Sequence, residues 1–142
     1  MNSYHKIFTG ITLGLSVFCS TTAVADLVVI VNPANHNQLT EADVRNIFLG
    51  KTRSYPDGTT AIPVELGNNT PAKNEFNKDI LKKDDAQVRA YWARMVFTGR
   101  ATPPKALGSD EEVINLIASN PNLMGYVSSE HLSKTVRVAY KP

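Results

Sequence analysis

The residues best suited to chemistry lie in a short polar loop, residues 66–71 (LGNNTP). The loop follows an apolar run and leads into a helical pattern with proline at its first position, so it sits at a helix N-terminus. Unpaired N–H groups and the positive end of the helix dipole attract an anion there, and amide and hydroxyl side chains add neutral donors. We therefore predict Asn68, Asn69 and Thr70 as ligand-binding residues, with the charge of Lys73 one turn further on.

The same loop also has a purely structural interpretation. In this interpretation, Thr70 does no more than cap the helix, and Asn68 and Asn69 form a tight turn. The two interpretations differ in whether the backbone amides of the loop are open to a ligand, and the sequence leaves both open.

A second polar segment, residues 98–105, combines two cations, two hydroxyls and two prolines after another helical pattern. Arg100 is the residue of this segment that we predict to contact the ligand, provided that the two loops approach each other. The alternative is a solvated connection with scattered charge. Lys51 and Arg53 form a third basic spot, for which a solvated surface is the simpler explanation.

The sequence gives little support for catalysis. It has no Gly-x-Ser-x-Gly elbow and no complete phosphate loop, and its one cysteine, Cys19, precedes the expected domain. Residues 129–131 contain the residue types of a catalytic triad, but a triad assembles from separate elements, so adjacency does not indicate one. His36 and His131 lack metal-ligand spacing. We predict no catalytic residue, no metal site and no cofactor.

Strand and helix patterns surround these loops. Residues 27–31 are a continuous β-branched run, typical of a strand buried on both faces, and residues 61–66 form a second strand. Between them, a helix begins at Thr40 and ends at Gly50. The order strand, helix, strand favours a right-handed parallel crossover.

Three more helices and two short strands are expected. They are a helix capped by Thr70, a helix over 85–97, a helix with a capping box at Ser109, and strands at 125–127 and 136–140. The helix over 85–97 has a long apolar face that includes Trp92, so we predict it as the main core helix. These elements predict a three-layer α/β/α fold with a mixed, mostly parallel sheet.

Composition limits the class of partner. The chain of 142 residues carries 15 Lys and Arg against 13 Asp and Glu, a net charge of +2. This near balance argues against nucleic acid, whose binding needs a concentrated basic face. We find no repeat, low-complexity run or linker, so residues 26–142 are expected to form one domain.

Residues 1–25 are expected to be a cleaved signal peptide. Lys6 supplies a basic start, an apolar stretch follows, and residues 23–25 (AVA) offer a cleavage site. The apolar stretch is shorter than the roughly 20 residues that a membrane-spanning helix needs. Cys19 follows the bulky Phe18 rather than a small residue, which disfavours lipidation. A periplasmic protein outside the membrane is therefore expected.

Three segments resemble the phosphate-binding proteins of bacterial ABC importers, in the type II periplasmic binding protein superfamily. Residues 39–51 are similar to the family's Leu-Ser/Thr, helix, Ile-Phe-Leu-Gly-Lys element, and this match is the most specific. Residues 62–70 with Phe76 resemble the strand, polar loop and helix that follow. Residues 120–127 resemble the family's Asn-Pro, apolar, Gly-Tyr-Val strand. The resemblance implies a single lobe of that fold.

The chain departs from the family at the implied oxyanion site. Family members with importer roles hold the anion between two lobes, whereas this chain is long enough for one. Their loop usually reads Arg-Ser/Asp-x-Ser-Gly-Thr, and here only Thr70 matches in type. A charge pair at 4 Å gains about 1 kcal/mol in water against about 4 kcal/mol at an effective dielectric near 20. We therefore expect weak anion binding, roughly millimolar to high micromolar.

Two functions of different classes follow. The first is a non-enzymatic periplasmic solute-binding protein for phosphate or a similar oxyanion, linked to phosphate ABC transport. The second is a ligand-free interaction module that docks on a membrane sensor, porin or transporter. A response to added anion distinguishes the first from the second.

Overall fold

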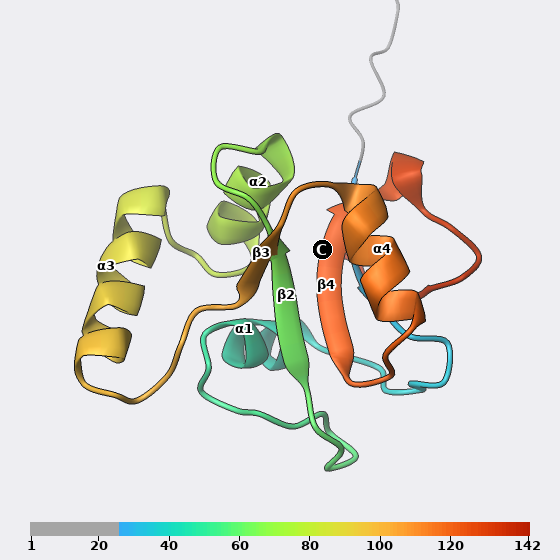
Figure 1. Ribbon diagram of the computed structural model, residues 1–142, viewed down its shortest axis with the longest axis horizontal. Helices are drawn as coiled ribbons and strands as arrows, with labels where there is room; N and C mark the ends of the chain where they lie inside the picture. Colours follow the sequence, from blue (N-terminus) through green and yellow to red (C-terminus); the bar gives the residue numbers. More distant parts are fainter. Residues whose placement is uncertain (1–25) are drawn as a thin grey trace, which may run out of the picture.

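The structure, a computed structural model, describes residues 26–142, and the expected signal peptide and Cys19 lie outside this range. Five strands form one sheet in the order β3-β2-β4-β1-β5 (Figure 1). The strands are β1 Leu27–Val31, β2 Ile62–Leu66, β3 Lys105–Leu107, β4 Leu123–Ser128 and β5 Arg137–Tyr140. The helices are α1 Glu41–Phe48, α2 Pro71–Asp79, α3 Asp85–Phe97, α4 Asp110–Ala118 and the short 3-10 turn η1 Ser129–His131. Within residues 26–142, none of the helices has the length and apolar character to span a bilayer.

The sheet is mixed, as predicted, but its pairings are two parallel and two antiparallel rather than mostly parallel. β2 pairs in parallel with β3 and β4, whereas β1 pairs antiparallel with β4 and β5. Four strands therefore run in one direction and β1 runs in the other. All residues of β1 are buried, which agrees with its continuous apolar run.

The predicted parallel crossover between the strands at 27–31 and 61–66 is wrong. β4 lies between β1 and β2, and β1 runs opposite to both. The crossover rule holds when the two strands belong to one parallel pairing. Here a strand from the far end of the sequence takes the place beside β1, and a local pattern does not reveal that.

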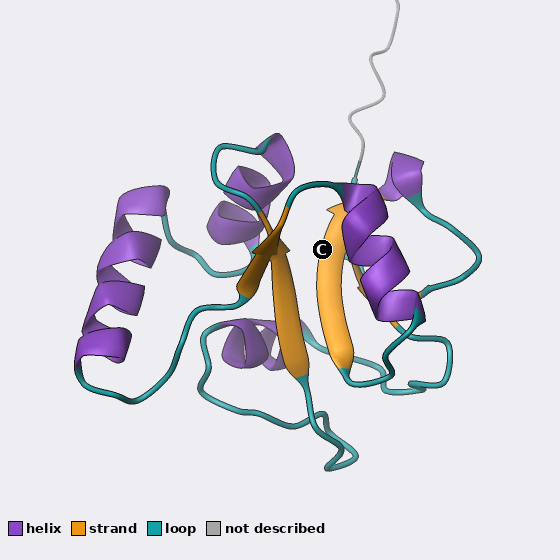
Figure 2. Ribbon diagram, viewed as in Figure 1, coloured by secondary structure: helices purple, strands orange, loops and turns teal. Residues whose placement is uncertain are grey.

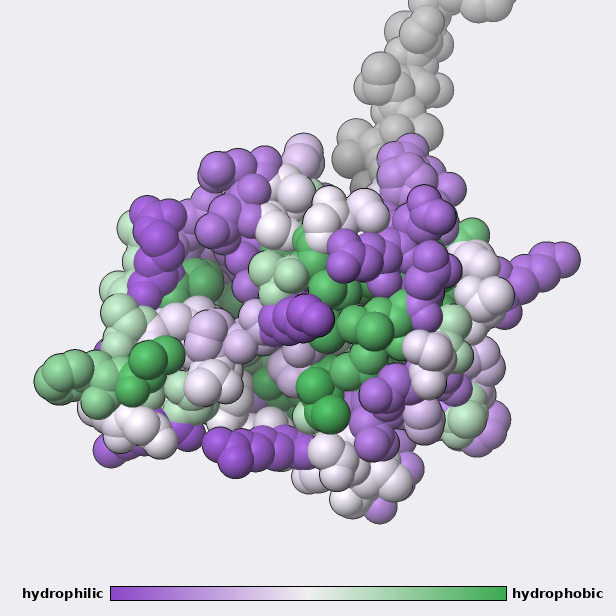
Figure 3. All heavy atoms as spheres, viewed as in Figure 1, coloured by the Kyte–Doolittle hydropathy of each residue, from purple (hydrophilic) through white to green (hydrophobic). Residues whose placement is uncertain are grey.

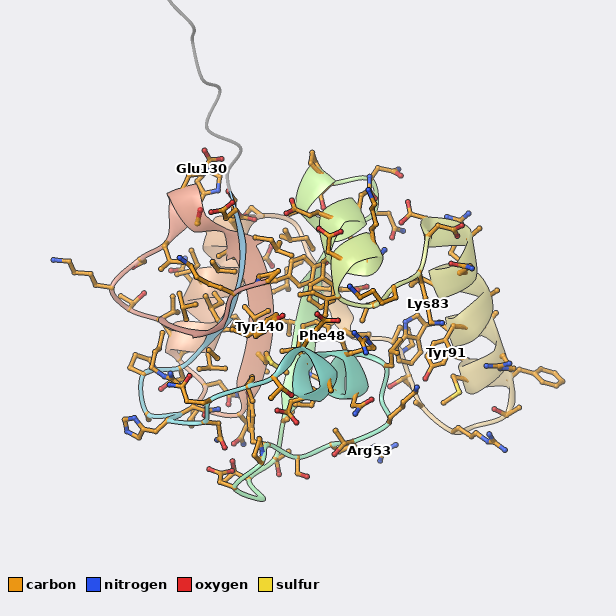
Figure 4. All side chains as sticks on the ribbon, turned by 180° about the vertical axis from the view of Figure 1, so that it is seen from behind. Phe48, Arg53, Lys83, Tyr91, Glu130 and Tyr140 are labelled. Carbon is orange, nitrogen blue, oxygen red and sulfur yellow. The ribbon has the colours of Figure 1, made fainter. Side chains whose placement is uncertain are left out.

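Helices cover both faces of the sheet, which makes three layers (Figure 2). α4 lies on one face, and α1 and α2 lie on the other, where Figure 4 shows them in front of the sheet. The approach of α4 to β4 requires a glycine, because a Cβ on Gly125 would lie 2.9 Å from both Val113 Cγ1 and Ile117 Cδ1. The three-layer α/β/α fold is confirmed.

An aromatic cluster joins α1 and α2 to the opposite face of the sheet. Tyr126 of β4 stacks on Phe76 of α2 with ring centroids 4.0 Å apart, and Phe48 of α1 lies 4.6 Å from Phe76. The Tyr126 hydroxyl accepts a hydrogen bond from the Leu66 N–H at 3.3 Å, where β2 ends. The polar loop that follows β2 is therefore anchored to the core at its first residue.

The prediction that the helix over 85–97 is the main core helix is wrong, because α3 lies at the edge of the molecule (Figure 1). Only Val88 and Trp92 of this helix are buried. A helical period shows which side chains share a face, but that face becomes core only where another element covers it. The segment after α1 covers part of the apolar face of α3. There the Tyr91 hydroxyl donates to the Leu49 carbonyl at 2.6 Å.

The strand predictions differ from the structure in one important place. The strands expected at 125–127 and 136–140 are present with slightly different ends, as β4 and β5. β3 was not predicted, because three residues are too few to show a period. The position of β3 fixes where the segments before and after it lie, and the segment before it contains Arg100.

Candidate functional site

The candidate site lies where the carboxyl ends of β2, β3 and β4 meet at one edge of the sheet. A pocket of about 880 Å³ opens there. Its walls come from the first turn of α2, the first turn of α4, and η1 with the segment after it. Loops that follow the carboxyl ends of neighbouring parallel strands are a recurrent position for ligand sites in α/β folds.

Thr70 lies at this pocket and caps α2. Its Oγ1 accepts a hydrogen bond from the Lys73 N–H at 3.3 Å and donates one to the Gly67 carbonyl at 3.1 Å. Asn69 has a φ of 65°, the left-handed conformation of a tight turn. The structural interpretation of the loop therefore accounts for the Thr70 hydroxyl. The Ala72 N–H, at the second position of α2 and in the pocket lining, has no acceptor within residues 26–142.

The Lys73 side chain forms an ion pair with Glu65 and is not part of the pocket lining. The residue is 7% exposed, and its Nζ donates to Glu65 Oε1 at 2.8 Å and to Asn68 Oδ1 at 3.1 Å. Burial raises the pKa of the Glu65 carboxyl, and the hydrogen bond from Lys73 opposes this shift. Lys73, which we predicted to contact a bound anion, therefore compensates the buried Glu65 carboxylate and holds the Asn68 side chain in the loop.

Arg100 lies at the other end of β2. In the parallel pairing of β2 with β3, Lys105 is opposite Val64 and Leu107 is opposite Leu66. Residues before β3 therefore lie at the amino end of β2, and residues after β3 lie at its carboxyl end. The Arg100 carbonyl accepts a hydrogen bond from Arg53 Nη2 at 3.4 Å. The structure thus brings Arg100 to the basic spot after α1, and does not bring it to the loop of Asn68, Asn69 and Thr70.

Sequence reasoning missed the carboxylates that face the pocket. Four acidic residues are part of its lining: Glu75, Asp110, Glu111 and Glu130. His131 is the one basic residue in that lining, and no lysine or arginine belongs to it within the described chain. These acids come from α2, α4 and η1, so the only sequence signal was the acidic start of the 110–118 helix.

The chain's own carboxylates occupy donors at the start of α4. Glu112 Oε2 accepts from the Gly108 N–H at 2.8 Å, and Ser109 Oγ accepts from the Glu112 N–H at 3.2 Å. Asp110 Oδ2 accepts from the Ser128 N–H at 3.1 Å and lies 2.7 Å from His131 Nδ1. The hydrogen bond to Asp110 raises the pKa of His131. An incoming anion would meet negative charge at this end of the pocket.

Comparison with known proteins identifies the fold and no family. No protein-family model and no curated protein matches the chain. An ABC-type phosphate transport receptor from Vibrio cholerae matches 80% of this chain and 44% of its own length, with a TM-score of 0.62 and 16% identity. A putative phosphate ABC transporter substrate-binding protein from Clostridium perfringens, with bound phosphate, matches 80% and 43%, with a TM-score of 0.58 and 14% identity.

PstS from Borrelia burgdorferi also matches, over 73% of this chain and 40% of its own length, with a TM-score of 0.54 and 14% identity. The chain therefore has the fold of one lobe of phosphate-binding proteins and spans less than half the length of these structures. By their names, the matched proteins are transport receptors and binding proteins, and not enzymes. The fold expected from the sequence resemblance is confirmed.

Proposed function

We propose that this chain is a non-catalytic docking domain, in which the pocket beside Thr70 receives a basic, partly apolar segment of a partner protein. The observation that carries the proposal is the charge of the pocket within residues 26–142: four carboxylates line it against one histidine, His131, which Asp110 already holds at 2.7 Å, and no lysine or arginine does. Apolar groups complete the lining, among them Leu66, Pro71 and Ile114. A surface of this kind complements a peptide segment that carries lysine or arginine side chains together with apolar side chains.

The size of the pocket also fits a segment better than a small inorganic ion. Its volume of about 880 Å³ is close to the upper end of small-molecule sites, roughly 300–1,000 Å³. An inorganic phosphate has the size of a few water molecules, at about 30 Å³ each. The partner segments that we propose belong to a membrane sensor, porin or transporter, which a periplasmic chain would meet.

Binding of a probe peptide tests this function. A peptide of alternating lysine and leucine, added to ten times its Kd, stabilises the folded chain by about 1.4 kcal/mol, which is roughly 3–8 °C in melting temperature. The matched peptide of alternating glutamate and leucine gives no shift. The double substitution Glu111→Gln and Glu130→Gln weakens binding of the lysine peptide about 30-fold, since each of the two charge pairs in water is worth about 1 kcal/mol, or roughly fivefold. Asp43→Asn with Asp57→Asn, which removes two carboxylates outside the pocket lining, is the matched charge control.

Oxyanion binding is the second candidate, and two observations favour it. The fold is shared with a protein whose structure holds phosphate, and the Ala72 N–H at the start of α2 has no acceptor among residues 26–142. Phosphate, sulfate or a similar anion would bind there weakly, with Asn68, Asn69 and Thr70 as neighbours and without a charge from Lys73 or Arg100. Uptake of phosphate with an ABC importer would be the role of such a site.

One substitution separates the two candidates. Thr70→Ala removes the cap of α2 and costs about 1 kcal/mol in either case. Only the oxyanion function predicts that this variant also loses a rise in melting temperature caused by phosphate. Calorimetric titration of the unmodified protein with phosphate should give a Kd in the millimolar to high micromolar range at best. Nanomolar affinity of the monomer would overturn the docking function in favour of the oxyanion function.

A further inference from the structure

The C-terminal end of α3 exposes large apolar side chains that the fold does not use. Phe97 is 92% exposed and Val96 is 53% exposed, whereas the helix buries Val88 and Trp92 on its other side. Apolar atoms project from the molecule at this end of α3 (Figure 3). An isolated exposed apolar residue needs no explanation, but here two adjacent ones form the tip of an element at the edge of the molecule.

Three arginines that form no ion pair within the described chain lie toward this end of α3. Arg94 and Arg100 are near the exposed pair in sequence, and Arg53 Nη2 donates to the Arg100 carbonyl at 3.4 Å. None of these three arginines forms an ion pair within residues 26–142. The segments 44–56 and 86–109, from which they come, contain no Asp or Glu. The charge at this end is therefore not compensated locally.

The acidic pocket lies away from this basic end. Arg100 is at the amino end of β2, whereas the pocket is at the carboxyl end, and Figure 4 shows Glu130 at the upper edge of the molecule and Arg53 at the lower edge. The net charge is only +2, although the pocket is acidic and the end of α3 is basic. If the basic face lies on a negatively charged surface, the pocket is directed away from it.

We propose that this end of the molecule, the α3 tip, binds an anionic lipid surface. We define the α3 tip as Arg53, Arg94, Val96, Phe97 and Arg100. Aromatic and aliphatic side chains that enter the headgroup region, with arginines at the level of the phosphates, are the usual composition of an interfacial membrane contact. The α3 tip projects from the molecule (Figure 3). A partner surface must therefore let the Phe97 ring insert and must present several anionic groups to the arginines. An anionic lipid bilayer does both.

Sedimentation with lipid vesicles tests the proposal. The protein is used after removal of the expected signal peptide, and mass spectrometry identifies its N-terminal residue. Vesicles with phosphatidylglycerol bind the protein, vesicles of phosphatidylcholine alone do not, and binding falls as NaCl is raised from 50 to 500 mM. The double substitution Arg94→Gln and Arg100→Gln weakens binding about 30-fold, at roughly fivefold per arginine. Val96→Ser with Phe97→Ser also weakens it at least tenfold.

Matched controls keep the proposal separate from general charge and from folding. Lys134→Gln with Lys141→Gln removes the same charge elsewhere, and Leu132→Ser removes another exposed apolar side chain; both should bind vesicles as the parent does. Phe97→Trp keeps binding, and its added fluorescence shifts to the blue with phosphatidylglycerol vesicles.

Either of two results overturns the proposal: no binding to phosphatidylglycerol at 50 mM NaCl, or an equal loss in the control variants. Tip-dependent binding of an acidic peptide without vesicle binding would assign the tip to a protein partner and would also overturn it. Glu111→Gln with Glu130→Gln leaves vesicle binding unchanged. A failure of the docking function at the pocket is therefore distinguishable from a failure at the tip.

Discussion

At the scale of single residues, the site is governed by which charges are already paired. Lys73 stands where a sequence argument expects an anion ligand, yet its Nζ lies 2.8 Å from Glu65 Oε1 and both side chains are almost buried. A buried lysine requires a partner because its desolvation is costly. The Glu65 carboxylate supplies that partner from within the chain, and the pocket is left with carboxylates.

The ion pair predicts a specific loss of stability. Lys73→Met leaves Glu65 buried without its counter-ion and should lower the free energy of unfolding by about 3 kcal/mol, measured by urea denaturation. Adding Glu65→Leu should restore most of that loss, because the uncompensated charge is then gone. The idea is wrong if Lys73→Met alone leaves stability unchanged, or if the double variant is no more stable than the single one.

At the scale of elements, the position of α4 against the sheet determines the second wall of the pocket. Gly125 lets α4 approach β4, and Asp110 at the start of α4 holds both the Ser128 N–H and the His131 ring. The pocket therefore depends on one close helix–strand contact and on one tether from α4 to η1.

Gly125→Ala tests the close contact. The added Cβ would lie 2.9 Å from Val113 Cγ1 and Ile117 Cδ1, so α4 must shift, and we expect a loss of about 1–3 kcal/mol in chemical denaturation. Gly67→Ala is the matched control, because its Cβ would meet only the Leu107 carbonyl at 3.7 Å. Equal stability of the two variants would contradict this account of the packing.

The tether from α4 to η1 predicts a dependence on pH. The Asp110 carboxylate raises the folded-state pKa of His131 above its ordinary value of 6.5. The stability from this contact is therefore fully present below about pH 6.5 and is lost as the pH rises through the folded-state pKa. His131→Gln should be less stable than the parent at pH 5.5 and equally stable at pH 9. A difference that does not change with pH would show that the ring carries no charge in this contact.

At the scale of the whole molecule, the fold separates two surfaces of opposite charge along the direction of β2. The pocket, with its acidic lining, lies at the carboxyl end of that strand, and the α3 tip lies toward its amino end. The matched structures share this fold over less than half of their own length.

If both proposals hold, the two surfaces act independently. Saturating the pocket with the lysine and leucine peptide should leave binding to phosphatidylglycerol vesicles unchanged, and Val96→Ser with Phe97→Ser should leave the Kd of the peptide unchanged. Sedimentation and calorimetry measure the two quantities. Mutual loss of binding would show instead that peptide and lipid compete for one surface.

The sequence by itself determined the four α-helices and four of the five strands. The caps at Thr40, Thr70 and Ser109 were predicted and are present, because a cap is a contact between residues at most four positions apart. The predicted capping box at Ser109 is not complete, because the Glu112 side chain accepts from the Gly108 N–H instead of the Ser109 N–H. The buried strand β1 and the fold of one lobe were likewise predictable, the first from its apolar run and the second from the resemblance of three segments.

Only the tertiary structure decided the direction of β1 relative to β2, the edge position of α3, and the separation of Arg100 from the loop of Asn68, Asn69 and Thr70. Each depends on a strand that comes late in the chain or is too short to show a period. The charge of the pocket was also decided there, since its carboxylates come from α2, α4 and η1. Local patterns record contacts within a few residues, whereas a site is made of side chains that only the packing of distant segments brings together.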